Sequence, residues 1–157
     1  MKILFLVIGK TSERWLDEGI SEYMMRIKRY APFELTVIPD MRNRGKIDIA
    51  QLKKLEGECI LKSVKDTDVV CLLDEKGKQF SSISLADWIN KEFSITSKRI
   101  VFVIGGAYGF SDAVYLRSNF TLSLSPMTFS HQMVRLIFLE QLYRAFTIIN
   151  NEPYHHA

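Results

Sequence analysis

The sequence predicts an α/β fold, a parallel sheet with helices on both of its faces. Two observations lead to this prediction. Strand-like and helix-like segments alternate along the chain, which is the pattern of β-α units. Several strand-like segments are also continuously apolar, as is typical of strands that are buried on both faces. At 157 residues the chain is long enough to bury a core, and we expect one domain, 1–157.

The first half of the chain supplies three strands and two helices. The run KILFLVIG predicts a buried strand at 2–9, and large apolar side chains at helical spacing predict a helix over about 12–30. The segment FELTVIP predicts a second strand at 33–39. A helix is expected over about 47–64, and DVVCLLD at 68–74 predicts the third strand.

The second half continues the alternation. The polar, glycine-containing EKGKQ at 75–79 predicts a turn, and a third helix is expected over about 82–93. RIVFVIGG at 99–106 predicts the fourth strand. A short helix near 111–117 then leads to a fifth strand, TLSLS at 121–125.

The last helix is expected over about 130–150 and completes the set of elements. Ligands of parallel sheets bind outside the carboxyl ends of the strands. Asp74, Gly105 and Ser125 each lie at such an end. We therefore expect the functional site to lie where these three residues converge.

Composition excludes several classes of protein. The net charge of +3 permits nucleic-acid binding but does not require it. Cys59 and Cys71 fit neither a disulfide framework nor a zinc spacing, so we expect reduced thiols and no metal. The apolar opening run is too short for a signal peptide, and no segment reaches transmembrane length. We expect a cytoplasmic protein without a membrane partner.

Two phosphate-binding motifs are matched only in part. The residues after the first strand, GKTS, end like a P-loop, but Leu4 stands where that motif needs a glycine. Gly106 and Gly109 match two glycines of the dinucleotide fingerprint, but Ile104 occupies the position of the first. Neither a P-loop nor a nicotinamide site is expected.

The last third of the chain carries the most informative motifs. They are the glycine loop IGGAYG at 104–109, PMTFSHQMVR at 126–135, EQLYRAF at 140–146 and the final EPYHHA at 152–157. Backbone-rich turns that follow strands are suited to a small-molecule pocket. A Tyr-His pair beside such a pocket would supply polar chemistry.

These motifs, together with the opening KILFLVIGK, resemble the ribosomal RNA large subunit methyltransferase H family, small members of the SPOUT or α/β-knot methyltransferases. The resemblance implies a C-terminal trefoil knot and a homodimer. It also implies methyl transfer from S-adenosyl-L-methionine to N3 of a pseudouridine in 23S rRNA of assembled ribosomes. Two alternatives stay open: a SPOUT methyltransferase that acts on another RNA such as tRNA, and a non-catalytic ribosome-binding dimer.

The resemblance also implies which residues contact the methyl donor. Adenine needs an apolar slot with backbone contacts, and a close approach at a strand end requires a residue without a Cβ, such as Gly105. Carried over by position, the donor-binding residues are Leu73, Gly105, Leu124, Ser125, Pro126, Met127, Thr128 and Phe129.

The reaction favours a histidine, because N3 of the base holds a proton at neutral pH and must lose it. From the Tyr-His pair of the resemblance we expect His155 to be the base, with Tyr154 orienting the target base or stacking on it. His131 is expected to be either a substrate contact or a structural helix cap. His156 is expected to be solvated.

Basic residues are the candidates for RNA contact. We count Arg135, one helical turn beyond His131, with the catalytic residues as a phosphate contact, with a surface ion pair as the alternative. Arg42 and Arg44, in the polar loop 40–46, are expected to bind rRNA, with solvated charge as the alternative. Glu140 and Arg144 are expected to form a structural i,i+4 pair.

Overall fold

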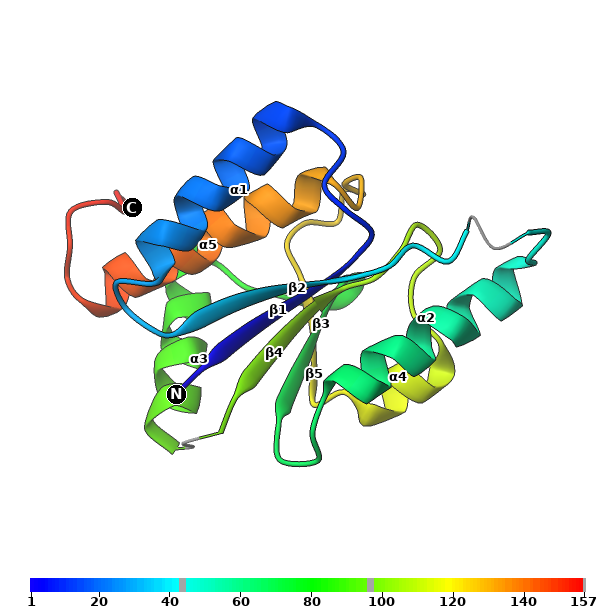
Figure 1. The fold of residues 1–157 in the computed structure, drawn as a ribbon. Helices are drawn as coiled ribbons and strands as arrows, with labels where there is room; N and C mark the ends of the chain where they lie inside the picture. Colours follow the sequence, from blue (N-terminus) through cyan, green and yellow to red (C-terminus); the bar gives the residue numbers. More distant parts are fainter. Residues whose placement is uncertain (43–44, 96–97, 157) are drawn as a thin grey trace.

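The computed structural model describes residues 1–42, 45–95 and 98–156 (Figure 1). Within these residues the chain forms a parallel sheet with the strand order β2-β1-β4-β3-β5. The strands are β1 (Ile3–Ile8), β2 (Phe33–Ile38), β3 (Val69–Gln79), β4 (Ile100–Ile104) and β5 (Phe120–Ser123). The helices are α1 (Arg14–Ile27), α2 (Ile49–Ser63), α3 (Ser82–Ile95), α4 (Asp112–Arg117) and α5 (Met133–Ile149).

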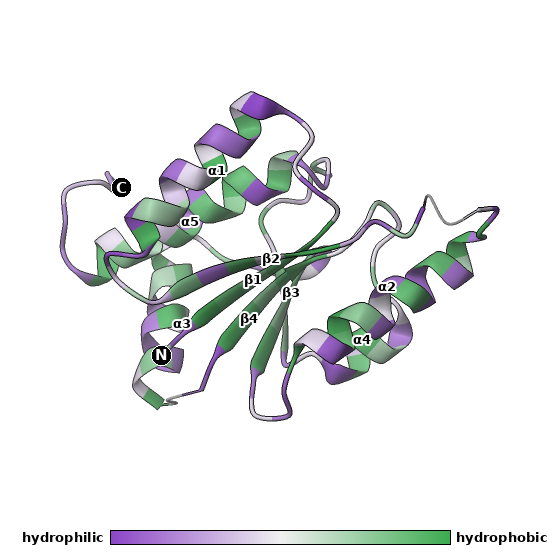
Figure 2. Ribbon diagram, viewed as in Figure 1, coloured by the Kyte–Doolittle hydropathy of each residue, from purple (hydrophilic) through white to green (hydrophobic). Residues whose placement is uncertain are grey.

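The helices lie in two layers, and this confirms the predicted α/β class. Helices α1, α3 and α5 cover one face of the sheet, whereas α2 and α4 cover the other (Figure 1). All residues of β1 and β4 are buried, as their continuous apolar runs predict. Figure 2 shows the central strands as hydrophobic over most of their length. No helix in the described part of the chain is both long and apolar enough to cross a membrane.

Aromatic packing joins α5 and α3 to the sheet. Phe138 of α5 is fully buried, and its ring centroid lies 4.8 Å from that of Phe102 in β4. Trp88 of α3 meets Phe120 of β5 edge-on, at 5.0 Å between ring centroids. The buried indole N–H of Trp88 has no hydrogen-bond partner among the residues that the structure describes. The ring contacts therefore hold Trp88 through its apolar body.

The predicted turn at 75–79 is wrong, because β3 continues to Gln79. Pairing with β5 is interrupted instead: Leu73 and Lys78 both pair with Leu122, so residues 74–77 form a bulge. Gly77 is required there, since a Cβ would lie 2.6 Å from the carbonyl carbon of Thr121. The end of the fifth strand and the start of the last helix also differ from the prediction, because β5 ends at Ser123 and α5 begins at Met133. Ser125 and the residues after it therefore lie in a loop.

Candidate functional site

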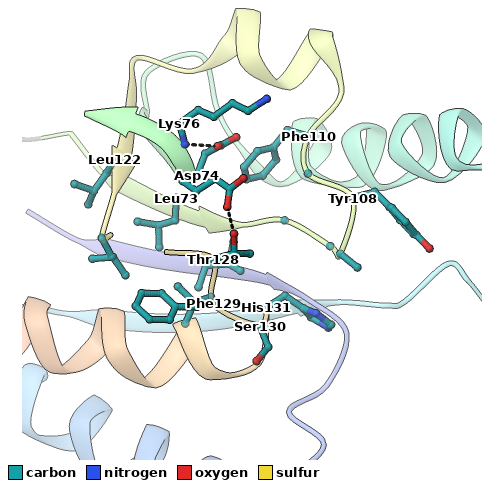
Figure 3. A pocket seen from close by; sticks show the side chains of 18 of the residues that line it. Leu73, Asp74, Lys76, Tyr108, Phe110, Leu122, Thr128, Phe129, Ser130 and His131 are labelled. Carbon is teal, nitrogen blue, oxygen red and sulfur yellow. Dashed lines mark hydrogen bonds between the residues drawn. The ribbon is translucent and has the colours of Figure 1, made fainter. Parts of the chain in front are cut away.

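A cavity of about 730 Å³ opens at the bulge of β3 and at the carboxyl ends of β4 and β5 (Figure 3). This is the convergence that the sequence predicts, because Asp74, Gly105 and Ser125 all line the cavity. The predicted donor-binding residues that line it are Leu73, Gly105, Leu124, Ser125, Met127, Thr128 and Phe129. Pro126 belongs to the same loop but does not line the cavity.

The glycine loop after β4 forms one wall of the cavity. Its turn is closed by a hydrogen bond from the Gly109 N–H to the Gly106 carbonyl, at 3.2 Å. Gly109 has a φ of +82°, a conformation that favours glycine. A Cβ on Gly106 would lie 2.7 Å from a carboxylate oxygen of Glu56, and one on Gly105 would lie 3.0 Å from the ring of Phe110. A side chain at Gly105 or Gly106 would therefore displace Phe110 or Glu56.

The opposite wall is a loop, residues 124–132, that is held against the β3 bulge. The Thr128 hydroxyl donates to the Glu75 carboxylate at 2.5 Å. Within the loop, the Met127 N–H donates to the Ser125 hydroxyl at 2.9 Å, and the Ser123 hydroxyl donates to the Ser125 carbonyl at 2.9 Å. The bulge, which the sequence does not predict, thus positions the loop that contains the predicted donor-binding residues 124–129.

Acidic side chains line the cavity near the bulge. The hydroxyl of Tyr115 donates to the carboxylate of Asp74, and burial and this hydrogen bond both raise the pKa of Tyr115. Asp74, Glu75 and Asp112 all line the cavity. Carboxylates at the edge of a partly apolar cavity favour a ligand that carries a positive charge. The sequence singles out only Asp74 among these three, because Glu75 lies in a run with the composition of a turn and Asp112 lies in a separate short helix.

His131 lines the same cavity, on the side of α5. Burial lowers its pKa, the charges of Arg135 and Arg42 lower it further, and Asp40 opposes them. The His131 imidazole is therefore neutral at pH 7, the form that can accept a proton. Of the two roles expected for His131, its place in the cavity favours contact with a ligand over a purely structural cap.

Arg135 is not a surface residue, and this corrects both roles expected for it. Its side chain is 1% exposed. The guanidinium donates to the carbonyls of Ile8 at 2.7 Å and Gly9 at 2.9 Å, and to the Thr11 hydroxyl at 3.2 Å. Burial lowers its pKa to about 10, so it stays charged at neutral pH. Arg135 joins α5 to the end of β1 and is not available to an RNA phosphate in the structure.

Arg42 does not line the cavity, but its charge acts on His131, which does. Arg42 is paired with Asp40 at 2.6 Å, with half of the arginine side chain exposed. Arg44 lies outside the described residues. Sequence reasoning missed Glu56, which is 5% exposed and has a pKa raised first by burial and then by the charge of Asp40. Its position on the buried side of α2, next to a glycine, could be found only from the fold.

Tyr154 and His155 do not line the cavity of their own chain, although the structure describes both. They lie along α5: the Tyr154 hydroxyl donates to Glu140 at 3.1 Å, and His155 contacts Arg144 at 3.3 Å. Arg144 lies ten residues beyond Val134, which lines the cavity, and is hence about 15 Å further along the helix axis. The expected Glu140–Arg144 ion pair is confirmed, at 2.5 Å.

Among the described residues there is no group of three or more histidine, cysteine, aspartate or glutamate side chains that could hold a metal ion. The polar groups of the cavity are hydroxyls, main chain, separate carboxylates, the imidazole of His131 and the ammonium groups of Lys53 and Lys76. This set is suited to an organic ligand with a polar and an apolar part.

Comparison with known proteins identifies the family. Residues 1–155 match the family described as "Predicted SPOUT methyltransferase". The ribosomal RNA large subunit methyltransferase H of Parabacteroides distasonis is 54% identical over 156 residues, which cover 99% of each chain. The protein of the same name from Christiangramia forsetii is 53% identical over the same share of each chain.

A solved structure shares the fold. A Legionella pneumophila protein described as a methyltransferase, in complex with the cofactor SAM, matches with a TM-score of 0.54 at 15% identity. The match covers 92% of this chain and 66% of the Legionella chain. At this identity the likeness concerns the fold alone.

Proposed function

The chain belongs to the SPOUT methyltransferase family, and we propose that it methylates large-subunit ribosomal RNA with S-adenosyl-L-methionine as the donor. In its finer form the proposal is transfer to N3 of a pseudouridine in 23S rRNA of assembled ribosomes. The observation that carries it is the similarity, over 99% of each chain, to proteins named as ribosomal RNA large subunit methyltransferases. Such a substrate would place the enzyme in the cytoplasm.

The cavity fits the donor. Its volume of about 730 Å³ lies within the range of small-molecule sites. Leu73, Leu122 and Leu124 offer an apolar slot for adenine, and the glycine loop offers main chain at close range. The carboxylates of Asp74 and Glu75 suit a cation. Bound there, S-adenosyl-L-methionine supplies an electrophilic methyl group on a cationic sulfonium.

The residues of the chain contribute orientation and proton transfer. The Thr128–Glu75 hydrogen bond holds loop 124–132 over the apolar slot, so a bound ligand is kept in one orientation. A reaction between an anionic base and a cation removes charge, and a dry cavity favours it. His131, neutral and within the cavity, is a group that can accept a proton there.

We also propose a homodimer, because the Tyr-His pair lies apart from the cavity of its own chain. A second copy would have to bring Tyr154 and His155 to the cavity. Exposed apolar side chains support an interface at the end of α5 that borders the cavity: Trp15, Met127 and Met133 are 56%, 76% and 37% exposed. The side chain of Gln132, just before α5, accepts from the N–H of Ser12, just before α1, at 3.0 Å. This hydrogen bond joins the starts of α1 and α5.

Two parts of the prediction, the Arg42 contact and the trefoil knot, stay part of this proposal, whereas the role expected for Arg135 is replaced. Arg42, half exposed, remains a candidate rRNA contact. The trefoil knot at the C-terminal end of the fold is supported by family membership. Arg135 receives a structural role, because its donors are taken up by β1 and the residues after it.

The decisive experiment is transfer of a labelled methyl group to three substrates: ribosomes that lack the modification, the same ribosomes that also lack pseudouridine, and total tRNA. We expect label in the first substrate only. Label in tRNA alone would contradict the ribosomal target. No label in any of them, with donor binding shown separately, would indicate a non-catalytic ribosome-binding dimer.

A mixed dimer tests the division of the site between two copies. One chain carries His155→Ala. The other carries Gly106→Val, whose side chain should displace the glycine loop that forms one wall of the cavity. We expect each homodimer to be inactive and the mixed dimer to regain up to half of wild-type activity, since one of its two sites has both an intact cavity and His155. A mixed dimer as inactive as its parents would contradict a shared site.

A further inference from the structure

The C-terminal segment, residues 150–156, turns back along α5 (Figure 1). Asn151 has a φ of +55°, a left-handed conformation that asparagine tolerates at the end of a helix. The Glu152 N–H then donates to the Thr147 carbonyl at 2.8 Å, and the Tyr30 hydroxyl donates to the Glu152 carboxylate at 2.6 Å. These two hydrogen bonds hold Glu152, which follows the turn, beside the helix.

Glu140 fixes the guanidinium of Arg144. One carboxylate oxygen of Glu140 accepts from Nε of Arg144 at 3.1 Å and from Nη2 at 2.5 Å. The same oxygen accepts from the Tyr154 hydroxyl at 3.1 Å. The guanidinium carbon lies 4.8 Å from the centroid of the Tyr154 ring. A planar group that is held at one edge and on one face has a single orientation left.

That orientation aims the remaining nitrogen of Arg144 at a histidine. Nη1 of Arg144 lies 3.3 Å from Nδ1 of His155. A guanidinium has donors only and stays protonated, so Nδ1 of His155 must be the acceptor. A neutral imidazole carries its one proton on the other nitrogen. His155 therefore has its proton on Nε2.

We propose that Arg144 is a positioning residue that fixes His155 with its proton on Nε2, so that His155 acts on the target as a hydrogen-bond donor and not as the base. This inference rests on the proposed function, in which His155 meets the pseudouridine. It differs from the role expected from the sequence, because an Nε2 that already holds a proton cannot take another from N3.

A donor at this place has a defined chemical effect. N3 of the base lies between two carbonyl groups, and loss of its proton spreads negative charge onto their oxygens. An N–H aimed at one of these oxygens stabilises the anion. The N3 proton passes to the neutral imidazole of His131. N3 then forms the bond to the methyl carbon with its freed electron pair, while the carbon–sulfur bonding pair stays on sulfur.

The tautomer can be measured without turnover, by nitrogen-15 NMR of the histidine rings in the wild type, Arg144→Gln, Arg144→Lys and Arg14→Gln. In the wild type we expect the Nδ1 of His155 to carry no proton and its Nε2 to be protonated. Arg144→Lys should keep this state, because lysine also donates, and Arg144→Gln should give a mixture. Arg14→Gln is the control, since Arg14 forms the same kind of i,i+4 pair, with Glu18. A protonated Nδ1 in the wild type would overturn the proposal.

The role is tested by replacing the imidazole. His155→Gln places an amide donor near the position of Nε2 but provides no base, whereas His155→Ala provides neither. With donor binding intact, we expect His155→Gln to stay within about 10-fold of the wild type and His155→Ala to lose about 100-fold or more. Equal loss in both variants would overturn the donor role. If the wild type itself transfers nothing, the proposed function fails, and the NMR result still decides the tautomer.

Discussion

The guanidinium of Arg135 lies 2.7 Å from the carbonyl oxygen of Ile8, the last residue of β1. The strand ends there, so this carbonyl and that of Gly9 would otherwise be buried without a strong donor. One arginine of α5 satisfies both. The loop that lines the cavity therefore joins a helix whose first turn is fixed to the sheet.

Replacing Arg135 should cost stability. Arg135→Met leaves two carbonyls unpaired, and we expect a loss of about 3 kcal/mol in the free energy of unfolding. Urea unfolding measures it. Arg14→Met is the matched control, because the Arg14 side chain is 93% exposed, and it should change the free energy by less than about 0.5 kcal/mol. Equal midpoints in the two variants would contradict the role of Arg135.

Gly106 should control donor affinity through Glu56. An added methyl group would lie 2.7 Å from the Glu56 carboxylate, so Gly106→Ala should displace the glycine loop. We expect the dissociation constant for S-adenosyl-L-methionine, measured by calorimetry, to rise about 10-fold, which is about 1.4 kcal/mol. The double variant Gly106→Ala/Glu56→Ala removes the clash and should regain most of the affinity. If the double variant binds as weakly as Gly106→Ala, another contact is responsible.

His131 should set the acid limit of the reaction. Burial, Arg135 and Arg42 lower the pKa of His131 from the ordinary value of about 6.5. The imidazole therefore loses its proton at a lower pH than an ordinary histidine does. As the pH rises through that lowered pKa, kcat/KM for methyl transfer should rise and then level off. Among the groups that act on His131, Asp40 is the one that raises this pKa. Asp40→Asn should therefore move the rise of kcat/KM to lower pH. If the rise of kcat/KM stays at the same pH or moves to higher pH, His131 is not the titrating group.

Arg42 should contribute to the salt dependence of ribosome binding. If its exposed guanidinium meets one phosphate, Arg42→Gln should weaken binding and reduce the slope of log K against log salt by about one. Binding assays between low and physiological salt give both quantities. Arg14→Gln removes the same charge from α1 and should affect the slope less. Identical slopes for the two variants would remove Arg42 from the RNA interface.

The sequence predicts those parts of the fold that depend on local pattern. The apolar runs of β1 and β4 could be assigned because burial on both faces leaves no polar position. The convergence of Asp74, Gly105 and Ser125 followed from one rule about parallel sheets. These observations require no knowledge of distant contacts.

Features that depend on distant contacts could not be predicted. The polar run after Asp74 has the composition of a turn, and only pairing with Leu122 keeps it in β3. Arg135 has the charge of a surface residue, and its burial depends on carbonyls 126 and 127 positions away in the sequence. The place of His155 depends on Arg144 and on the left-handed turn at Asn151.

Trp88 and Trp15 lie in different surroundings and give the protein two separate fluorescence probes. Trp88 packs against Phe80, Phe102 and Phe120, whereas Trp15, the only other tryptophan, is 56% exposed at the start of α1. Fluorescence from Trp88 should report loss of the core during unfolding. Quenching of Trp15 by a soluble quencher should report coverage of its surface by a second copy. Trp15→Phe and Trp88→Phe would separate folding from association without an added dye.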